Sequence, residues 1–371
     1  IKITSLTFNS SLIKSVKLPI ISLFLPSIKT SFNGSLTLIL TSSLTLRPIL
    51  IKFLTKSIFS SKSLNFICDI NEFSGVKKIA AKVANDVKLV FGFDPVMQTD
   101  LSLGSENFDG LDSYVLFGTA TTSSVFEKYL SAEDRTKREV YSFTVEENRI
   151  VIAGSDKRGV IYGLFHLSEL LGVSPLVDWF KLNPAKKESV EIAACEMKAS
   201  KEPSVRYRGF FINDEWPAFG NWCTRNFGGF NAKAYEQIFL LLLRMKGNYM
   251  WPAMWMWSFY ADDPENSRLA DDMGIIMGTS HHEPMARNHQ EWIRHRDDYG
   301  SWNYAKNPKV LDQFFREGLE RMKHTEDIVT IGMRGDGDAE MDGGNNIELM
   351  KRIIKNQRKI IADVTKKPAS R

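Results

Sequence analysis

The chain has 371 residues, of which 43% are hydrophobic and 25% charged, so it can form two or three domains with sizeable cores. Its formal net charge of +4 is uneven, because residues 1–68 hold eight Lys and Arg and no Asp or Glu, which leaves 40 basic and 44 acidic residues elsewhere. This mildly acidic remainder argues against a nucleic-acid-binding face, and three widely spaced cysteines without a CxxC pair argue against a disulfide framework or a zinc knuckle.

The first 65 residues lack the pattern of a folded domain. Residues 1–68 contain fourteen serines and alternate Ser or Thr with Leu or Ile without a steady helical or strand period. Lys outnumbers Arg seven to one, whereas transit peptides favour Arg. The longest apolar runs, such as LPIISLFLP from Leu18, are shorter than the ~20 residues of a membrane span. We expect residues 1–65 to be a mistranslated, non-globular segment or, as a second choice, a leader-like one.

Residues 66–200 have the pattern of a small α+β domain. A helical period at residues 76–87 precedes a strand at 113–118 and a short helix near 123–130. Two β-rich runs, from Glu139 and from Arg149, predict a hairpin, and the amphipathic stretch at 157–172 predicts a helix that ends at a glycine.

From Val205 onward the sequence repeats a strand-then-helix pattern four times. The predicted strands start at Val205, Asn248, Gly274 and Asp327, and the predicted helices cover residues 232–246, 285–298, 309–324 and 347–364. Such repeats predict a parallel sheet, either doubly wound or closed into a barrel. A (β/α)₈ barrel takes about 250 residues. Residues 201–371 therefore fit the first half of a TIM-type barrel, with about four βα units.

Three of these strands end in polar clusters. The motifs are YRGFFINDEWP from Tyr207, IIMGTSHHEP from Ile275 and IVTIGMRGDGD from Ile328. In βα architectures the carboxyl ends of the strands carry the active site. We expect the three clusters to meet at one rim.

These motifs, together with NYMWPAMW from Asn248, resemble those of the glycoside hydrolase family 115 α-glucuronidases. The resemblance is strong over the predicted barrel and weaker over residues 65–200. It implies removal of α-1,2-linked glucuronic acid, or its 4-O-methyl ether, from glucuronoxylan with inversion at the anomeric carbon. It also implies that the general acid is a glutamate on a later strand, beyond Arg371. We therefore expect residues 1–371 alone to be inactive and prone to aggregate.

Inverting hydrolysis needs a carboxylic acid and a carboxylate about 6.5–9.5 Å apart. Glu215 follows the first barrel strand, and Asp336 and Asp338 follow the fourth, so these three are the catalytic candidates. Alternatively, Asp214 and Glu215 cap a turn or pair with Arg206, and the GDGD run from Gly335 forms a tight turn or a calcium loop.

The candidate substrate-binding residues combine hydrogen-bonding, cationic and aromatic side chains. Arg334 suits a uronate carboxylate, with an ion pair to Asp336 or Asp338 as the alternative. Adjacent residues of an extended segment point to opposite sides, so we expect one of His281 and His282 to contact sugar and the other to pack inward. The tryptophans suit sugar faces or the core. The full set is Asn213, Asp214, Trp251, Trp255, His281, His282 and Arg334.

Two other functions stay open at this stage: a non-catalytic carbohydrate-binding relic, and a metal-dependent barrel hydrolase that uses His281, His282 and Asp336. We expect no metal and no cofactor, since no HExxH-like spacing occurs. The expected partners are glucuronoxylan or aldouronic acid oligosaccharides, with no nucleic acid and no membrane. For the full-length protein, the family implies secretion and leaves a homodimer open.

Overall fold

The computed structural model describes residues 55–57, 63–104, 108, 111, 113–146, 149–193, 196–197, 199–213, 216–337, 339–341 and 346–369. The chain divides into two units, Ile1–Leu54 and Thr55–Arg371. All of the first unit lies outside the described residues, so the interpretation of that segment stays a prediction.

The first part of the second unit is built on a mixed sheet of six strands. Its order is β3-β2-β4-β6-β5-β8. The first four strands are parallel, and β5 runs antiparallel to both β6 and β8. The strands in chain order are β2 (Asn65–Asp69), β3 (Val96–Leu101), β4 (Tyr114–Thr119), β5 (Tyr141–Val145), β6 (Arg149–Gly154) and β8 (Glu196–Met197). A separate antiparallel pair joins β1 (Thr55–Ser57) and β7 (Glu191–Ala193).

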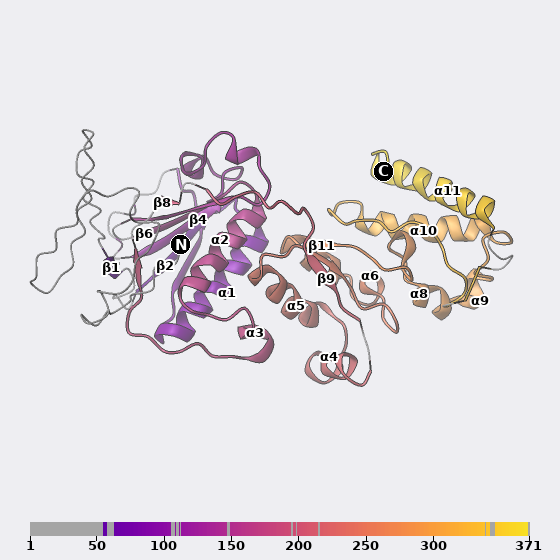
Figure 1. Ribbon diagram of the computed structural model, residues 1–371, viewed down its shortest axis with the longest axis horizontal. Helices are drawn as coiled ribbons and strands as arrows, with labels where there is room; N and C mark the ends of the chain where they lie inside the picture. Colours follow the sequence, from indigo (N-terminus) through magenta and orange to yellow (C-terminus); the bar gives the residue numbers. More distant parts are fainter. Residues whose placement is uncertain are drawn as a thin grey trace, which may run out of the picture. The chain divides into compact units, whose positions relative to one another are not determined.

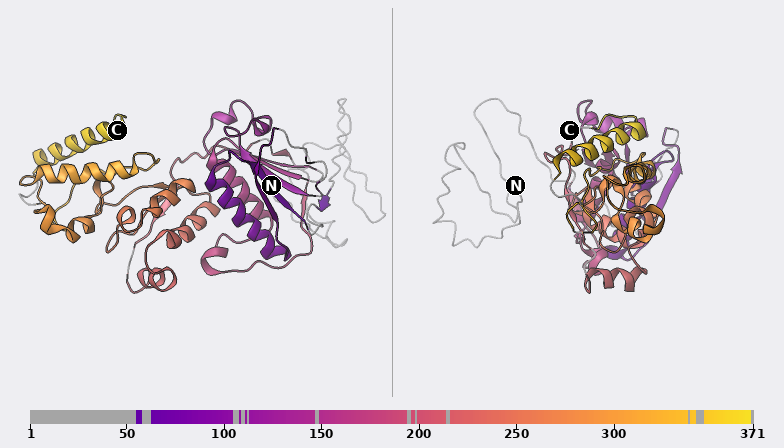
Figure 2. Two further views of the ribbon diagram at one scale, coloured as in Figure 1. Left: turned by 180° about the vertical axis from the view of Figure 1, so that it is seen from behind. Right: turned by 90° about the vertical axis from the view of Figure 1, so that its right-hand side faces the viewer.

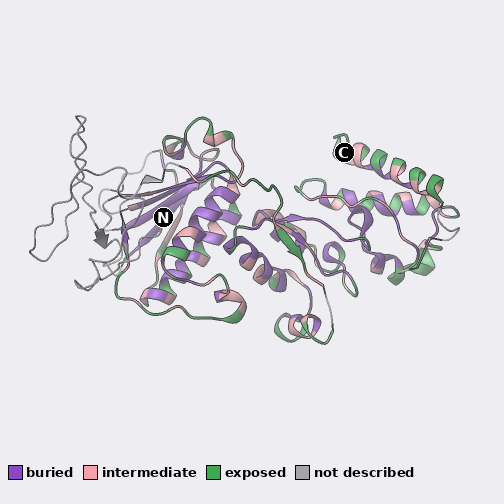
Figure 3. Cartoon of the chain, viewed as in Figure 1, coloured by how far each residue is buried: buried purple, intermediate pink, exposed green. Residues whose placement is uncertain are grey.

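Both faces are covered at the centre of this sheet, where β2, β4 and β6 are buried along nearly their whole length (Figure 3). Helices α1 (Ser74–Phe91) and α2 (Lys157–Leu170) lie side by side on one face (Figures 1 and 2). Phe66 packs in the core on the side of the helices, whereas its neighbour Ile67 belongs to a second core with Phe126. Phe126 lies in the 3₁₀ helix η1 (Ser124–Tyr129), which covers the second face. Successive side chains of a strand point to opposite faces, so Phe66 and Ile67 enter different cores. The predicted helices and hairpin are confirmed here.

The second part contains a parallel three-stranded sheet in which sequential strands are neighbours. Tyr249 of β10 is aligned with Gly209 of β9 and with Ile276 of β11. The connections between the strands are helical, so each unit repeats strand then helix. The elements in chain order are β9 (Gly209–Phe211), α4 (Phe219–Phe227), α5 (Ala232–Arg244), β10 (Tyr249–Trp251), α6 (Phe259–Asp262), α7 (Glu265–Asp272) and β11 (Ile276–Met277).

Helical structure dominates the chain after β11. Residues 285–298 were expected to form one helix, and this prediction is wrong: Met285 and Ala286 have φ of 58° and 55°, which a right-handed helix does not accommodate. Helix α8 then begins with a capping box at Asn288. The Asn288 side chain and the Glu291 side chain each accept a backbone N–H there. The elements are η3 (Pro284–Ala286), α8 (His289–Arg294), α9 (Arg296–Tyr299), α10 (Pro308–Met322) and α11 (Ile347–Thr365).

The fourth predicted strand, from Asp327, is an extended segment rather than a strand. Ile328 donates a backbone hydrogen bond to Met277 of β11 at 2.8 Å. Where a ladder would continue, the Asp327 carboxylate accepts the Met277 N–H at 3.0 Å, so a side chain replaces the backbone partner. The segment nevertheless lies beside β11. The described residues thus form a mixed α/β fold with a parallel sheet, and the half-barrel stays a prediction.

A buried ion pair joins helix α5 to helix α1 within this unit. Arg244 of α5 donates to both carboxylate oxygens of Asp86 in α1, at 2.7 and 3.1 Å, and Ser168 of α2 donates to the same carboxylate. Both charged side chains are almost fully buried. None of the helices that the structure describes is long and apolar enough to span a bilayer.

Candidate functional site

Side chains that follow two strands and one extended segment meet in the described part of the chain. Trp255 follows β10, His282 follows β11, and Arg334 follows the extended segment that starts at Asp327. The Trp255 and His282 rings lie edge to face with centroids 5.1 Å apart. The Arg334 Nη1 atom is 3.0 Å from His282 Nε2. The indole, the imidazole and the guanidinium therefore form a cluster of three side chains in contact.

The two neighbouring histidines differ in exposure, but they lie in a turn and their ring centroids are 4.3 Å apart, so they do not point to opposite sides as an extended segment would require. His281 is exposed and His282 is buried. The turn that holds them is closed by backbone and side-chain bonds, because Glu283 N donates to Ser280 O at 3.1 Å and Thr279 Oγ1 donates to Glu283 O at 2.8 Å. The sugar-binding role of either histidine stays a prediction.

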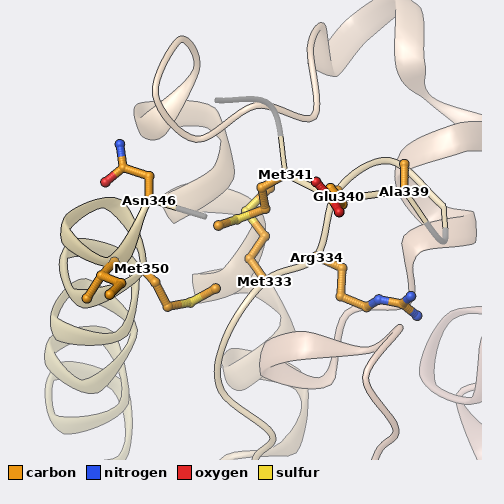
Figure 4. A pocket seen from close by; sticks show the side chains of 9 residues that line it. Met333, Arg334, Ala339, Glu340, Met341, Asn346 and Met350 are labelled. Carbon is orange, nitrogen blue, oxygen red and sulfur yellow. The ribbon is translucent and has the colours of Figure 1, made fainter. Parts of the chain in front are cut away.

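Arg334 projects away from an apolar hollow on its other side. The methionine side chains of that hollow gather together, and the Arg334 guanidinium points away from them (Figure 4). The hollow measures about 470 Å³ and lies between residues 333–341 and the start of α11. The ion pair considered as the alternative for Arg334 does not form with Asp336, whose carboxylate contacts Arg296 and His289.

Asp336 is the one catalytic candidate among the described residues. Arg296 Nη2 donates to its Oδ1 at 2.7 Å, and His289 Nε2 lies 3.0 Å from the same atom. The Arg296 guanidinium holds the pKa of Asp336 below its usual value, because it stabilises the ionised carboxylate. Asp336 is therefore an ionised acceptor at neutral pH.

The other catalytic candidates cannot be placed. Glu215 and Asp338 lie outside the described residues, as does Asp214, so the distance from Glu215 to Asp336 stays untested. Asn213 is partly buried just after β9. Trp251 contacts side chains of its own sheet. Its indole N–H donates to the Tyr249 hydroxyl at 2.7 Å, and its ring meets the Phe211 ring edge to face with centroids 5.8 Å apart.

This part of the chain is similar to known proteins. Residues 200–371 match the family model described as glycosyl hydrolase family 115. A solved structure described as a family GH115 4-O-methyl-α-glucuronidase, BtGH115A, with specificity for decorated arabinogalactans, is 29% identical with a TM-score of 0.71. The similarity covers 82% of this chain and 40% of that one.

Residues 200–371 are thus similar to glycoside hydrolase family 115.

A second solved structure is much more distant. The chitobiase of Flavobacterium johnsoniae is 14% identical with a TM-score of 0.49, over 84% of this chain and 48% of that one. This similarity is too remote to bear on the function of the chain. No curated protein matches the sequence. The chain spans about 40% of the length of BtGH115A.

The family 115 segment contains a cavity of about 250 Å³ beside His282. Its lining has no acidic or basic chain other than histidine, and the polar groups there are turned to protein partners: Asn288 donates to Met254 O and Trp257 O, and His289 faces Asp336. The cavity is therefore apolar in effect, which suits the C–H face of a sugar. It is lined by Met254, Trp255, Met256, His282, Asn288, His289, Gln290, Ile293 and Gly337.

A buried polar layer supports the histidine loop of the family 115 segment, and sequence reasoning missed it. Arg321 of α10 binds both carboxylate oxygens of Glu291, at 2.7 and 3.0 Å. Asn288 donates to Glu283 Oε1 at 3.0 Å, and burial raises the pKa of Glu283 to about 8. The one sequence signal available was the spacing of Asn288 and Glu291, which is typical of a capping box.

The proposed metal ligands are not gathered into a site. Within the described ranges, no group of three or more His, Cys, Asp or Glu side chains is placed to hold an ion. His282 faces Arg334, while Asp336 faces Arg296 and His289. The metal-dependent alternative thus has no geometric support among these residues.

Proposed function

We propose that this protein is an α-glucuronidase that removes α-1,2-linked glucuronic acid or its 4-O-methyl ether from glucuronoxylan. The observation that carries the proposal is the contact of Arg334 with His282 beside Trp255 at the strand ends. A guanidinium binds a carboxylate through two parallel hydrogen bonds, and an indole suits the apolar face of a pyranose. The match of residues 200–371 to the family 115 model and the similarity to BtGH115A support the same interpretation.

His282 would orient the guanidinium for the uronate. A guanidinium has only donors, so Nε2 of His282 is the acceptor of this hydrogen bond and the imidazole is neutral, with its proton on Nδ1. One edge of Arg334 is then occupied and its direction is set. The guanidinium would bind the carboxylate, and the exposed His281 would donate to a sugar hydroxyl.

For hydrolysis with inversion, we assign Asp336 to the ionised partner of the pair. Its lowered pKa suits a carboxylate that helps to activate water and is unsuited to a proton donor. Glu215 and Asp338 remain the other proposed catalytic carboxylates, and Asn213 and Asp214 the proposed sugar contacts near the first strand.

The polysaccharide itself has two candidates. Glucuronoxylan is the one that the sequence motifs imply. BtGH115A is described as specific for decorated arabinogalactans. Glucuronic acid on an arabinogalactan is therefore the second candidate substrate, and both polymers belong in the same assay.

Calorimetric titration of glucuronate and of glucose into residues 1–371 tests the binding part of the proposal. The wild type should prefer glucuronate, and Arg334→Gln should weaken its binding by about 10-fold or more, because a charge-assisted bidentate contact is lost. Arg334→Lys should fall between them, since an ammonium keeps the charge without the fork. Arg268→Gln, on an exposed ion pair of α7, is the matched control. Equal affinity for both sugars in the wild type would contradict the proposal.

Uronate release from glucuronoxylan and arabinogalactan tests the catalytic part. The expectation that residues 1–371 alone release nothing stays a prediction, and turnover by them would refute it. A longer protein that contains this chain should release the β-anomer first by proton NMR, as inversion requires. Tight binding with no release by that protein would favour the non-catalytic carbohydrate-binding alternative.

A further inference from the structure

One segment of the chain holds the turn that carries Arg334. We define the clasp segment as residues 289–302, which cover α8, α9 and the residues that follow. Trp302 Nε1 donates to the Arg334 carbonyl at 3.0 Å. Arg296 donates to both oxygens of the Asp336 carboxylate, and His289 Nε2 lies 3.0 Å from one of them. None of the three was among the residues that the motifs singled out.

These contacts lie on both sides of Gly335, so they hold the conformation of the turn. The Arg334 carbonyl is anchored before the glycine and the Asp336 side chain after it. At Gly335 a Cβ atom would come within 2.1 Å of the Glu340 carbonyl oxygen, so the turn closes tightly onto the backbone that follows it. With both neighbours of the glycine held, the Arg334 side chain is left pointing at His282.

The clasp segment is itself braced against the core. Trp302 is buried and meets Trp292 edge to face at 5.1 Å and His289 at 4.7 Å. Trp292 is fully buried, and its indole donates to the Gly300 carbonyl at 3.1 Å. Side chains that are locked by packing can hold a binding group within the narrow tolerance that recognition needs.

We infer that Arg296 and Trp302 are positioning residues for the uronate carboxylate, which act through the turn at Gly335 on the direction of Arg334. The inference rests on the proposed function, because it assigns the placement of the group that binds the uronate. Neither residue would touch the sugar. Their effect should therefore depend on Arg334 being present.

A double-mutant cycle on glucuronate affinity tests this dependence. Arg296→Gln should weaken glucuronate binding by about 5-fold, and Trp302→Phe, which keeps the ring but removes the N–H, by about 3-fold. In the Arg334→Gln background each change should alter the affinity by less than about 1.5-fold, because the group they position is gone. Arg296→Lys should restore part of the loss, since it keeps one charged donor to Asp336.

Three results would be informative against this expectation. Equal losses with and without Arg334, or parallel losses of glucose and glucuronate affinity, would mean that the clasp segment only stabilises the fold, and would overturn the inference. Unchanged affinity in both single variants, with Arg334→Gln still impaired, would overturn it while leaving the proposed function in place. Absence of glucuronate binding by the wild type would remove both. Arg268→Gln again serves as the control.

Discussion

Glu283 comes directly after the two histidines of the candidate site and is fully buried. Its Oε1 accepts from Asn288, whereas its Oε2 has no hydrogen-bond partner among the described residues. The nearby Arg321 is already paired with Glu291. Burial therefore dominates, and the pKa of Glu283 rises from its ordinary 4.5 to about 8, so the group keeps its proton at neutral pH.

This shift gives the protein a pH-dependent stability that Glu283→Gln should remove. The folded-state pKa lies above the unfolded one, so the stabilisation is full below about pH 4.5 and is lost as the pH rises to about 8. The free energy of unfolding of the variant, relative to wild type, should rise between pH 5 and pH 8.5 by on the order of 2–4 kcal/mol. Urea unfolding at the two pH values measures it, with the exposed Glu348→Gln as control. A pH-independent difference would show that Glu283 is ionised in the fold.

At this scale the sequence could predict exposure but not partners. The difference in exposure between His281 and His282 was expected, but from strand alternation, whereas the structure places both in a turn with ring centroids 4.3 Å apart. The choice of Arg334 from bidentate chemistry stays a prediction. The partner of Asp336 could not be found, because Arg296 lies 40 residues earlier in an irregular helical segment and no spacing rule relates the two. The same holds for Trp302 and the Arg334 carbonyl.

The helices were predicted more accurately than the strands. Long amphipathic stretches such as α5, α10 and α11 were found within a few residues of their ends, since their 3.6-residue period is sustained over several turns. The strands β9, β10 and β11 have only two or three paired residues each, so their pattern was too short to bound. The parallel strand β2, which is buried on both faces and carries no alternation, was missed, whereas β4 was found from its apolar run.

Arg244 and Asp86 make a prediction about how the elements are joined. Arg244→Met would leave the Asp86 carboxylate buried without its cation, and should lower the free energy of unfolding by about 3–5 kcal/mol. Adding Asp86→Leu to that variant should recover most of the loss, because the unpaired charge is then removed. Urea denaturation of the single and double variants measures both effects. Arg268→Met, from an exposed pair, should change stability by less than about 1 kcal/mol.

At the scale of the whole molecule, the motifs indicated the family and the architecture supports it with a parallel sheet whose successive strands are adjacent. They could not decide whether Glu215 and Asp336 converge, because that distance depends on loops whose conformation no periodic pattern specifies, and Glu215 lies outside the described residues. The proposed recognition of a uronate therefore rests on the side of the site that the structure describes, where Trp255, His282 and Arg334 meet.

The most direct test of uronate recognition by Arg334 is the response of its side chain to glucuronate. In residues 1–371 with ¹⁵N-labelled arginine, the Nε–Hε resonance of Arg334, assigned from Arg334→Lys, should shift and saturate as glucuronate is added, and stay unchanged with glucose. Glucuronate that binds without moving this resonance, or that moves it no more than glucose does, would contradict the claim that Arg334 receives the carboxylate.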